Sequence, residues 1–327
     1  MTKLTIIGDP HIKPDNLDTI SKLFGLVESM GNDCVWLGDQ LDTKELIRGR
    51  CINALFDYLS TSKLNHTLLI GNHCWFNLEC KEHSQEVLKV LENVIIVDKP
   101  ILIPVECEKG AISTLFFPYF HDIEEFKKSL LQFKKENPKL LFMHQGVIGF
   151  DYGNGLIATG KSSGEISPSD IPKKLKVISG HFHKYAENGN ITFLGTPFSH
   201  SFGESDQTKY LGVLHLPEMN LELVETNFPK HKTYYIDCGS PNPITPTLNT
   251  KDYNRVILTG SKEAVDEFKV DGFPPSTKIL KKADVTQNLS LGVDETLDNL
   301  KLFELWAKEN SLNPDTIDLG LNILRKV

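Results

Sequence analysis

Five short apolar segments of this sequence each run into a glycine or directly into residues of the types that bind metal ions. They are TIIGDPH with Asp9 and His11, VWLGDQLD with Asp39 and Asp42, LLIGNH with Asn72 and His73, LLFMH with His144, and VISGHFH with His181 and His183. Glycine allows the backbone to turn sharply and lets a ligand approach closely. If these segments are neighbouring strands, the side chains that follow them converge on one site.

The donor types in these segments define the chemistry of such a site. They comprise two or three aspartates, one asparagine and four or five histidines, with no convincing cysteine. This set suits manganese, iron or zinc better than calcium, and it is too rich in histidine for a magnesium site. One ion cannot use so many donors. Two ions about 3.5–4 Å apart, bridged by a shared carboxylate, would use them all and would clamp the attacking and leaving oxygens of a phosphoryl displacement.

The elements that must position these residues alternate between strand and helix patterns over the first two hundred residues. Apolar runs predict buried strands at 4–7, 34–37, 67–70 and 140–143, and amphipathic stretches predict helices over 17–27, 46–59, 87–91 and 123–133. Strands that alternate with helices indicate an α/β fold with a partly parallel sheet. Ligands of such sheets usually lie beyond the carboxyl ends of the strands.

The second half of the sequence has a different pattern. From about Val177 strand patterns dominate, and the proline-rich stretch 240–250 is the best candidate for a linker. A β-α-β pattern follows it, and the chain reads as helical from Asp294. We therefore predict three parts: 1–238 with the site, 239–290 as a small α+β domain, and 291–327 as C-terminal helices.

Length and charge restrict the function further. The 327 residues suffice for roughly two domains, and the composition is that of an ordinary globular protein. A net charge of −8 is a poor basis for holding nucleic acid by bulk electrostatics, so any DNA binding must be local. No apolar run approaches the roughly 18 residues of a membrane span, and the N-terminus has no signal-peptide pattern. We expect a cytoplasmic protein, in the host cytoplasm if the source is viral, with six free cysteines.

The series D-x-H, G-D-x-x-D, G-N-H, H and G-H-x-H, in this order and spacing, resembles the calcineurin-like metallophosphoesterase superfamily. The text NITFLGTPFSHSFGE and the layout after it are similar to SbcD-type nuclease subunits, in the compact form of bacteriophages. The motifs cover residues 1 to about 200, and beyond about 235 only the layout matches. The resemblance implies a four-layer α/β/β/α sandwich, a small cap domain and C-terminal helices that bind a partner ATPase.

By motif position, the resemblance also implies the ligands. One metal would be held by Asp9, His11, Asp39 and His183, and the other by Asp39, Asn72, His144 and His181. Asp39 would bridge the two ions. His73 would face the scissile phosphate and protonate the leaving group or stabilise the transition state. This role suits an imidazolium, because a departing alkoxide is strongly basic.

Three further residues carry expectations. The superfamily usually has an acid after G-N-H, and here Cys74 stands in its place, so we expect altered support of His73. Asp42 either binds metal, caps the following helix or orients a ligand. His200 lies in a loop that the resemblance places near the active site, where it would contact substrate.

The resemblance implies a manganese-dependent DNA nuclease, with Mg²⁺, Fe²⁺ or Zn²⁺ as alternative metals. It would act as an exonuclease on double strands and as an endonuclease on single strands or hairpins, in DNA repair, recombination or replication. Its partner would be an SbcC-like coiled-coil ATPase. A homodimer is expected through helices near 46–59 and 84–92. Two alternatives stay open: an enzyme for small phosphomonoesters or cyclic nucleotides, and a scaffold without catalysis.

Overall fold

The structure is a computed structural model that describes residues 2–43, 46–161, 164–270 and 272–283, together with Phe303, Ala307 and Ile317. The chain divides into two units, which are described separately here. The first contains Met1–Tyr234, Pro246–Val256 and Gly272–Lys278, and the second contains Tyr235–Thr245, Ile257–Asp271 and Ile279–Val327. Apart from those three single residues, the predicted C-terminal helices at 291–327 lie outside the described residues.

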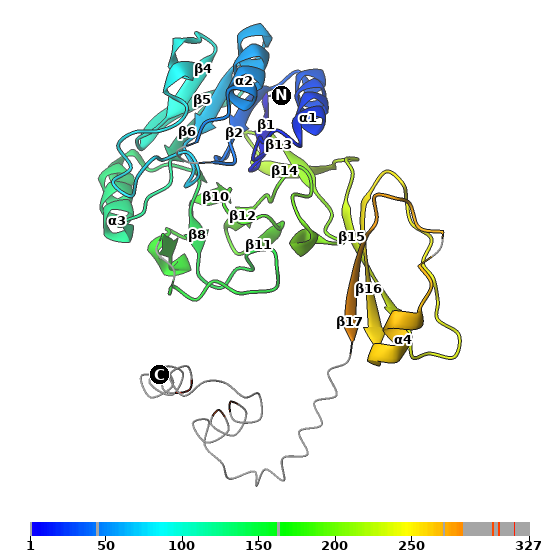
Figure 1. The fold of residues 1–327 in the computed structure, drawn as a ribbon. Helices are drawn as coiled ribbons and strands as arrows, with labels where there is room; N and C mark the ends of the chain where they lie inside the picture. Colours follow the sequence, from blue (N-terminus) through cyan, green and yellow to red (C-terminus); the bar gives the residue numbers. More distant parts are fainter. Residues whose placement is uncertain are drawn as a thin grey trace. The chain divides into compact units, whose positions relative to one another are not determined.

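The first unit contains a six-stranded sheet with the order β14-β13-β1-β2-β3-β4. Its strands are β1 (Thr2–Ile7), β2 (Asp33–Trp36), β3 (His66–Leu69), β4 (Val94–Val97), β13 (Tyr210–Leu216) and β14 (Asn220–Glu225). The strands from β1 to β4 pair in parallel, and β13 and β14 continue the sheet antiparallel. The carboxyl ends of β1, β2 and β3 therefore lie on one side of the sheet, and β1 and β2 are seen side by side in Figure 1.

A second six-stranded sheet has the order β11-β12-β10-β7-β6-β5. Its strands are β5 (Ile101–Cys107), β6 (Gly110–Phe117), β7 (Leu140–Met143), β10 (Lys176–Ser179), β11 (Ala186–Asn188) and β12 (Ile191–Phe193). The four central strands β6, β7, β10 and β12 are parallel, and β5 and β11 close the edges antiparallel. A short parallel pair, β8 (Gly146–Val147) with β9 (Glu165–Ile166), follows β7.

Helices cover the outer faces of the two sheets. They are α1 (Leu17–Met30), α2 (Gly49–Thr61) and α3 (Ile123–Gln132), with short 3₁₀ turns η1 (Glu86–Val90), η2 (Phe133–Glu136), η3 (Pro168–Asp170) and η4 (Phe202–Glu204). Helix α1 ends at Gly31, whose left-handed φ of 66° suits glycine. Helix α3 begins at Asp122, whose carboxylate accepts hydrogen bonds from the first-turn amides of Glu124 and Glu125.

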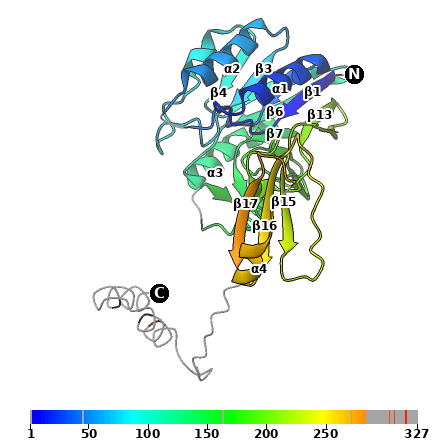
Figure 2. The ribbon, with the colours of Figure 1, turned by 45° about the vertical axis from the view of Figure 1, so that its right-hand side comes forward.

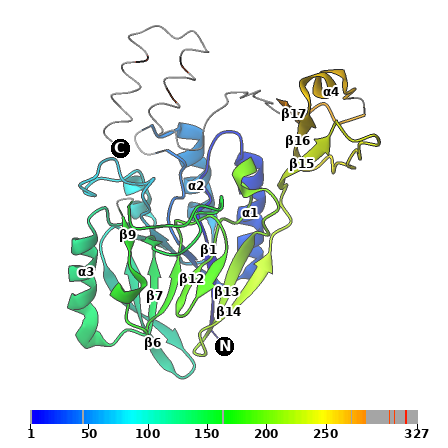
Figure 3. The same cartoon turned by 90° about the horizontal axis from the view of Figure 1, so that it is seen from below.

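Three apolar clusters define four layers. One cluster joins α1 and α2 to the first sheet, including Phe24, Leu55 and Trp36. A second joins α3 to the second sheet through Phe126 and Phe117. The third lies between the sheets and contains side chains from the centres of both, among them Ile6, Val35, Leu69, Phe142 and Ile178. The order is therefore helix, sheet, sheet, helix, which confirms the predicted α/β sandwich (Figure 3).

Strands β15 (His231–Asp237), β16 (Tyr253–Gly260) and β17 (Lys278–Ala283) form a three-stranded sheet in that order (Figure 2). Helix α4 (Lys262–Glu267) follows β16 and is capped by the Ser261 hydroxyl, which accepts a hydrogen bond from the Ala264 amide. The β-α-β pattern in this stretch thus corresponds to real elements. The assignment of 239–290 as a cap domain stays a prediction. No helix among the described residues is both long and apolar enough to cross a bilayer.

Several local expectations were wrong. Helix α2 begins at Gly49, so Leu46 and Ile47 precede it, with exposed fractions of 65% and 37%. The stretch near 87–91 forms only a 3₁₀ turn, because Val87 and Val90 are exposed and only Leu88 is buried. The hairpin of β5 and β6 escaped prediction: β5 is a half-buried edge strand, and Pro104 interrupts its apolar run after three residues.

Candidate metal centre

The predicted site residues all follow strands of the two sheets directly. Asp9 and His11 come after β1, and Asp39 comes after β2. Asn72 and His73 follow β3, His144 follows β7, and His181 and His183 follow β10, so the first sheet supplies five of these residues and the second sheet supplies three. The structure brings all eight together, as the side-chain distances below show.

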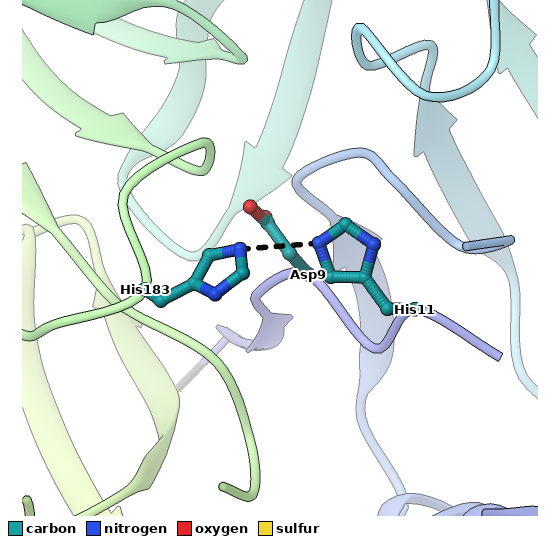
Figure 4. Close-up of side chains that lie close together, drawn as sticks. All are labelled: Asp9, His11 and His183. Carbon is teal, nitrogen blue, oxygen red and sulfur yellow. Dashed lines mark hydrogen bonds between the residues drawn. The ribbon is translucent and has the colours of Figure 1, made fainter. Parts of the chain in front are cut away.

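Asp9, His11 and His183 form what we call the first ligand group. One ligand atom from each lies within 4.8 Å of the others. The Nε2 atoms of the two imidazoles face each other at 3.1 Å, with the Asp9 carboxylate beside them (Figure 4). The side chains of Asp9 and His11 are buried, whereas the side chain of His183 is 31% exposed.

Asn72, His144 and His181 form the second ligand group. The Asn72 Oδ1 atom lies 3.0 Å from His144 Nε2 and 2.9 Å from His181 Nδ1. His144 is fully buried, and its Nδ1–H donates a hydrogen bond to the carbonyl of Leu37 at 2.8 Å. That bond leaves Nε2 as the atom that faces the centre.

Asp39 lies between the two groups. Its Oδ2 atom is 3.3 Å from His144 Nε2 in the second group and 4.0 Å from His11 Nε2 in the first. Its Oδ1 atom accepts a hydrogen bond from the backbone amide of His73 at 2.8 Å. The carboxylate therefore occupies the position that a bridging ligand requires.

The backbone is shaped to bring these side chains together. His11, Asp39 and His181 have positive φ angles of 42°, 47° and 85°, which non-glycine residues adopt rarely and mostly at functional sites. Gly71 and Gly180 allow close approach, because a Cβ atom at either position would collide with the carboxylate of Asp39 or of Asp9 respectively.

Burial and charge perturb these groups strongly. Burial raises the pKa of Asp9 to about 6. Burial would also raise the pKa of Asp39, but the neighbouring imidazoles, His144 first, hold it well below its usual range. Burial would lower the pKa of His144, yet the carboxylates of Asp39 and Asp9 raise it to about 9. The buried carboxylates therefore stabilise a positive charge at the centre.

The residues present fit a divalent metal. The Oδ1 atom of Asp9 and the Nδ1 atom of His11 are buried without a hydrogen-bond partner. A neutral His144 has only a lone pair at Nε2, and this atom faces two acceptor oxygens, of Asn72 and Asp39. Such an arrangement is repulsive unless a cation lies there, either a proton on the ring or a metal ion. Carboxylate, imidazole and amide donors are ligands of Mn²⁺, Fe²⁺ and Zn²⁺.

The backbone of Asp42 holds His73 beside the centre. Its Nδ1–H donates to the backbone carbonyl of Asp42 at 2.8 Å, so Nε2 is left for reaction. The Asp42 carboxylate lies 3.7 Å from His11 Nδ1, and Asp42 belongs to none of the candidate metal groups among the described residues. It does not cap α2, whose N-cap is Arg48. The Asp42 carbonyl thus positions His73, which is not a predicted metal ligand, and the expectations that Asp42 binds metal or orients a ligand stay predictions.

Cys74 lies against the carboxylate of Asp39, and no contact with the His73 ring is seen among the described residues. Its fully buried thiol lies 3.9 Å from Asp39 Oδ1 and 3.6 Å from Gln40 Oε1, and Gln85 Nε2 donates to the sulfur at 3.2 Å. Burial raises the pKa of this thiol. Support of His73 comes instead from the Asp42 carbonyl.

Sequence reasoning missed two residues that support the first ligand group. Glu204 accepts a hydrogen bond from His183 Nδ1 at 2.9 Å and pairs with Lys209 at 2.7 Å. Lys209 also donates to the His183 carbonyl at 2.8 Å, and both charged side chains are buried. A carboxylate on the far nitrogen of a metal-binding histidine fixes its tautomer and orientation. A hint was available, because Glu204 ends the SHSFGE text singled out above.

His200 lies at the edge of the centre. Its Nε2–H donates to the Asp9 carbonyl at 3.1 Å, and its ring centroid is 5.2 Å from that of His11. Burial lowers its pKa to about 3, so the ring is neutral near pH 7. The structure thus places His200 next to the predicted ligands, and its contact with substrate stays a prediction.

Comparisons with known proteins agree with this geometry. Residues 2–185, more than half of the chain, match the family described as calcineurin-like phosphoesterase. A viral protein named "Putative phosphoesterase 244L", from Invertebrate iridescent virus 6, is 26% identical over 82% of this chain and 97% of its own length.

Two other similarities are more distant. "Exonuclease subunit 1" of Enterobacteria phage T4 is 22% identical over 86% of this chain and 85% of its own length. Among solved structures, an archaeal phosphodiesterase is 15% identical, covers 69% of this chain and 100% of its own, and superimposes with a TM-score of 0.36. From the family match and the two-sheet fold with its buried Asp and His centre, we conclude that the chain belongs to the calcineurin-like phosphoesterase family.

Proposed function

We propose that this protein is a two-metal DNA nuclease that hydrolyses phosphodiesters. The observation that carries the proposal is the convergence of eight motif residues from both sheets on one buried centre, with Asp39 between two ligand groups. The similarity to a phage exonuclease subunit along most of both chains supports DNA as the substrate.

In this proposal the first ligand group and Asp39 hold one ion, and Asp39 and the second ligand group hold the other. Divalent ions in such a site supply Lewis acidity and neutralise the charge that builds up on the phosphoryl oxygens. The chain's own contribution is a set of ligands whose orientation is already fixed. The Leu37 carbonyl fixes His144, the Glu204 carboxylate fixes His183, and the His181 amide donates to Asp9 Oδ2 at 2.7 Å.

His73 is proposed as the proton donor. The carbonyl of Asp42 is an acceptor only, so Nδ1 must carry a hydrogen and Nε2 is the nitrogen that exchanges the catalytic proton. In the protonated ring Nε2–H donates that proton to the departing alkoxide oxygen as its bond to phosphorus breaks and the oxygen of a water molecule forms the new bond to phosphorus. The His73 amide bonds to Asp39 at the same time, which ties this ring to the metal ligands.

We further propose manganese as the working metal and an SbcC-like ATPase as partner. The word "subunit" in the name of the phage relative supports a multi-subunit assembly. An acidic chain needs such help, because a partner supplies phosphate contacts that a net charge of −8 does not. Homodimer formation near 46–59 and 84–92 and a cytoplasmic location remain part of the proposal.

The test is cleavage of 3′- and 5′-labelled linear duplex, hairpin and single-stranded DNA in manganese, with and without the partner ATPase. A small phosphate diester and a phosphomonoester serve as parallel substrates. We expect DNA cleavage that chelation abolishes. Robust turnover of the small esters with all DNA substrates intact would contradict the proposal and favour a small-molecule phosphoesterase. Failure to bind micromolar manganese would favour a scaffold.

A further inference from the structure

A cleft of about 250 Å³ in the first unit adjoins the metal centre and is not used by the chemistry described so far. Its lining includes Lys13, Phe198, His200, His231 and Tyr253. His200 joins the cleft to the centre, since its Nε2–H bonds to the Asp9 carbonyl. Any molecule in the cleft therefore lies one residue away from the predicted metal ligands.

Aromatic rings form one wall of the cleft. His231 and Tyr253 are stacked with centroids 4.7 Å apart and an interplanar angle of 25°. Phe202 meets His231 edge-on at 4.8 Å, and the guanidinium of Arg255 lies 4.6 Å above the Phe202 ring. The ring of His231 is thus in contact with Phe202 and Tyr253, and its Nδ1 atom lies within hydrogen-bond distance of Ser199 Oγ, at 2.9 Å. The pair is a rigid platform.

The outer ring of this platform is available. Tyr253 is 48% exposed, and His231 is its sole ring neighbour within the described part of the chain. Phe198, only 4% exposed, packs against His200 with ring centroids 4.6 Å apart and adds an apolar side chain to the lining of the same cleft. A cleft lined by an exposed aromatic ring and an apolar side chain suits a flat heteroaromatic ring, and stacking of this kind accepts every base.

Charge plays a smaller part in the cleft than the rings do. Lys13 is half-buried and forms no ion pair with any residue the structure describes, so its ammonium is available for a phosphate. The exposed carboxylate of Asp15 also lines the cleft, so electrostatics alone does not select an anion there. The cleft is smaller than the roughly 300–1,000 Å³ of most small-molecule pockets, and this size suits a single unpaired base better than a base pair.

We propose that this cleft binds an unpaired nucleotide of a single-stranded nucleic acid next to the scissile phosphate. The base stacks on Tyr253, and Lys13 contacts a backbone phosphate. The inference rests on the proposed nuclease function and adds a substrate preference to it: the strand that enters the centre is unpaired at this position.

Binding of a fluorescein-labelled dT₈ oligonucleotide to the full chain in EDTA tests the cleft without catalysis. We expect Tyr253→Ala to weaken binding on the order of tenfold and Tyr253→Phe, which keeps the ring, to stay within about twofold of wild type. Tyr235→Ala is the matched control, because Tyr235 is an exposed tyrosine on the neighbouring strand β15 and does not line the cleft. Lys13→Ala should reduce the salt dependence by about one phosphate contact, and Lys22→Ala on α1 should not.

A series of dT₈ oligonucleotides with one abasic position completes the test. Wild type should bind one oligonucleotide of the series, in which the base that stacks on Tyr253 is missing, more weakly than the others. Tyr253→Ala should bind all members of the series equally. Equal binding by wild type and Tyr253→Ala, or equal binding of dT₈ and a fully abasic strand, would overturn the cleft assignment. Binding as expected without cleavage in manganese would overturn the nuclease proposal alone.

Discussion

The two ligand groups are built from similar donors but are held in different ways. In the first group, a charged side chain fixes one ligand: Glu204 binds His183 and is itself neutralised by Lys209. In the second group, neutral groups hold the ligands: the Leu37 carbonyl binds His144, and Asn72 contacts both histidines. The orientation of His183 therefore depends on a buried ion pair, whereas that of His144 depends on a backbone carbonyl.

This difference has a consequence for metal binding. A charged partner raises the basicity of a histidine ligand and can be removed by one substitution, whereas a backbone carbonyl cannot. We expect substitutions outside the ligands to weaken the first group selectively. The second group should respond only to changes in its own ligands or in Asp39.

The largest effect is expected from Asp39→Asn, which removes the shared charge and so breaks both groups at once. The loss of a carboxylate between two cations should lower manganese content from two per chain to less than one. Activity should fall by on the order of 10³-fold or more. Elemental analysis after dialysis checks the metal content. Retention of two tightly bound ions would show that Asp39 does not bridge.

His73→Ala should separate chemistry from metal binding. The ring contacts the centre from outside both ligand groups, so metal content should remain two per chain while kcat falls by about 10²–10⁴-fold. A full kcat in this variant would refute the proton-donor role. A reduced kcat together with a metal content below two would instead make His73 a ligand.

Glu204→Gln sharpens the comparison between the groups. The manganese affinity of the site that contains the first ligand group should fall about 10–100-fold, while the affinity of the site that contains the second group is unaffected. The variant also leaves the buried Lys209 unpaired, which destabilises the fold by about 3–5 kcal/mol. The double variant Glu204→Gln/Lys209→Met is the control: it should recover stability but not affinity. Equal weakening of both sites would remove the distinction between the groups.

The smallest effect concerns pH and a histidine outside both groups. His66 is buried between Trp36, whose Nε1–H donates to its Nδ1, and Ser62, and burial lowers its pKa to about 4. The neutral ring therefore stabilises the fold above the unfolded pKa of about 6.5, and this contribution is lost as the pH falls towards 4. Urea unfolding of metal-free protein at pH 7.5, 6 and 5 should show the decline. His66→Gln should flatten it, and an unchanged slope would mean that His66 already carries its charge in the fold.

Much of the site was predictable because its ligands follow buried strands immediately. The run LLFM before His144 and VIS before Gly180 are short and apolar, and parallel strands of this kind end at one edge. Glu204 and Lys209 were not predictable in this way. Glu204 lies in a 3₁₀ turn and Lys209 just before β13, and their pairing with His183 depends on loop geometry that has no period in the sequence.

The fold, like the site, has parts that the sequence predicts and parts that it does not. Helix α1 was predicted well because Ile20, Leu23, Phe24 and Val27 form a complete apolar stripe. The edge strand β5 was not, because its burial alternates weakly and Pro104 interrupts its pattern. Sequence periodicity reports burial against a core, so it is informative at sheet centres and weak at edges.

The central claim is that Asp39 joins two metal sites, and electron paramagnetic resonance of the manganese-loaded protein tests it most directly. Two Mn²⁺ ions that share a carboxylate are magnetically coupled, so the account predicts a broad multiline spectrum at two equivalents of metal. In Asp39→Asn the spectrum should lose this coupling. A simple six-line spectrum of isolated ions in the wild-type protein at two equivalents would contradict the account.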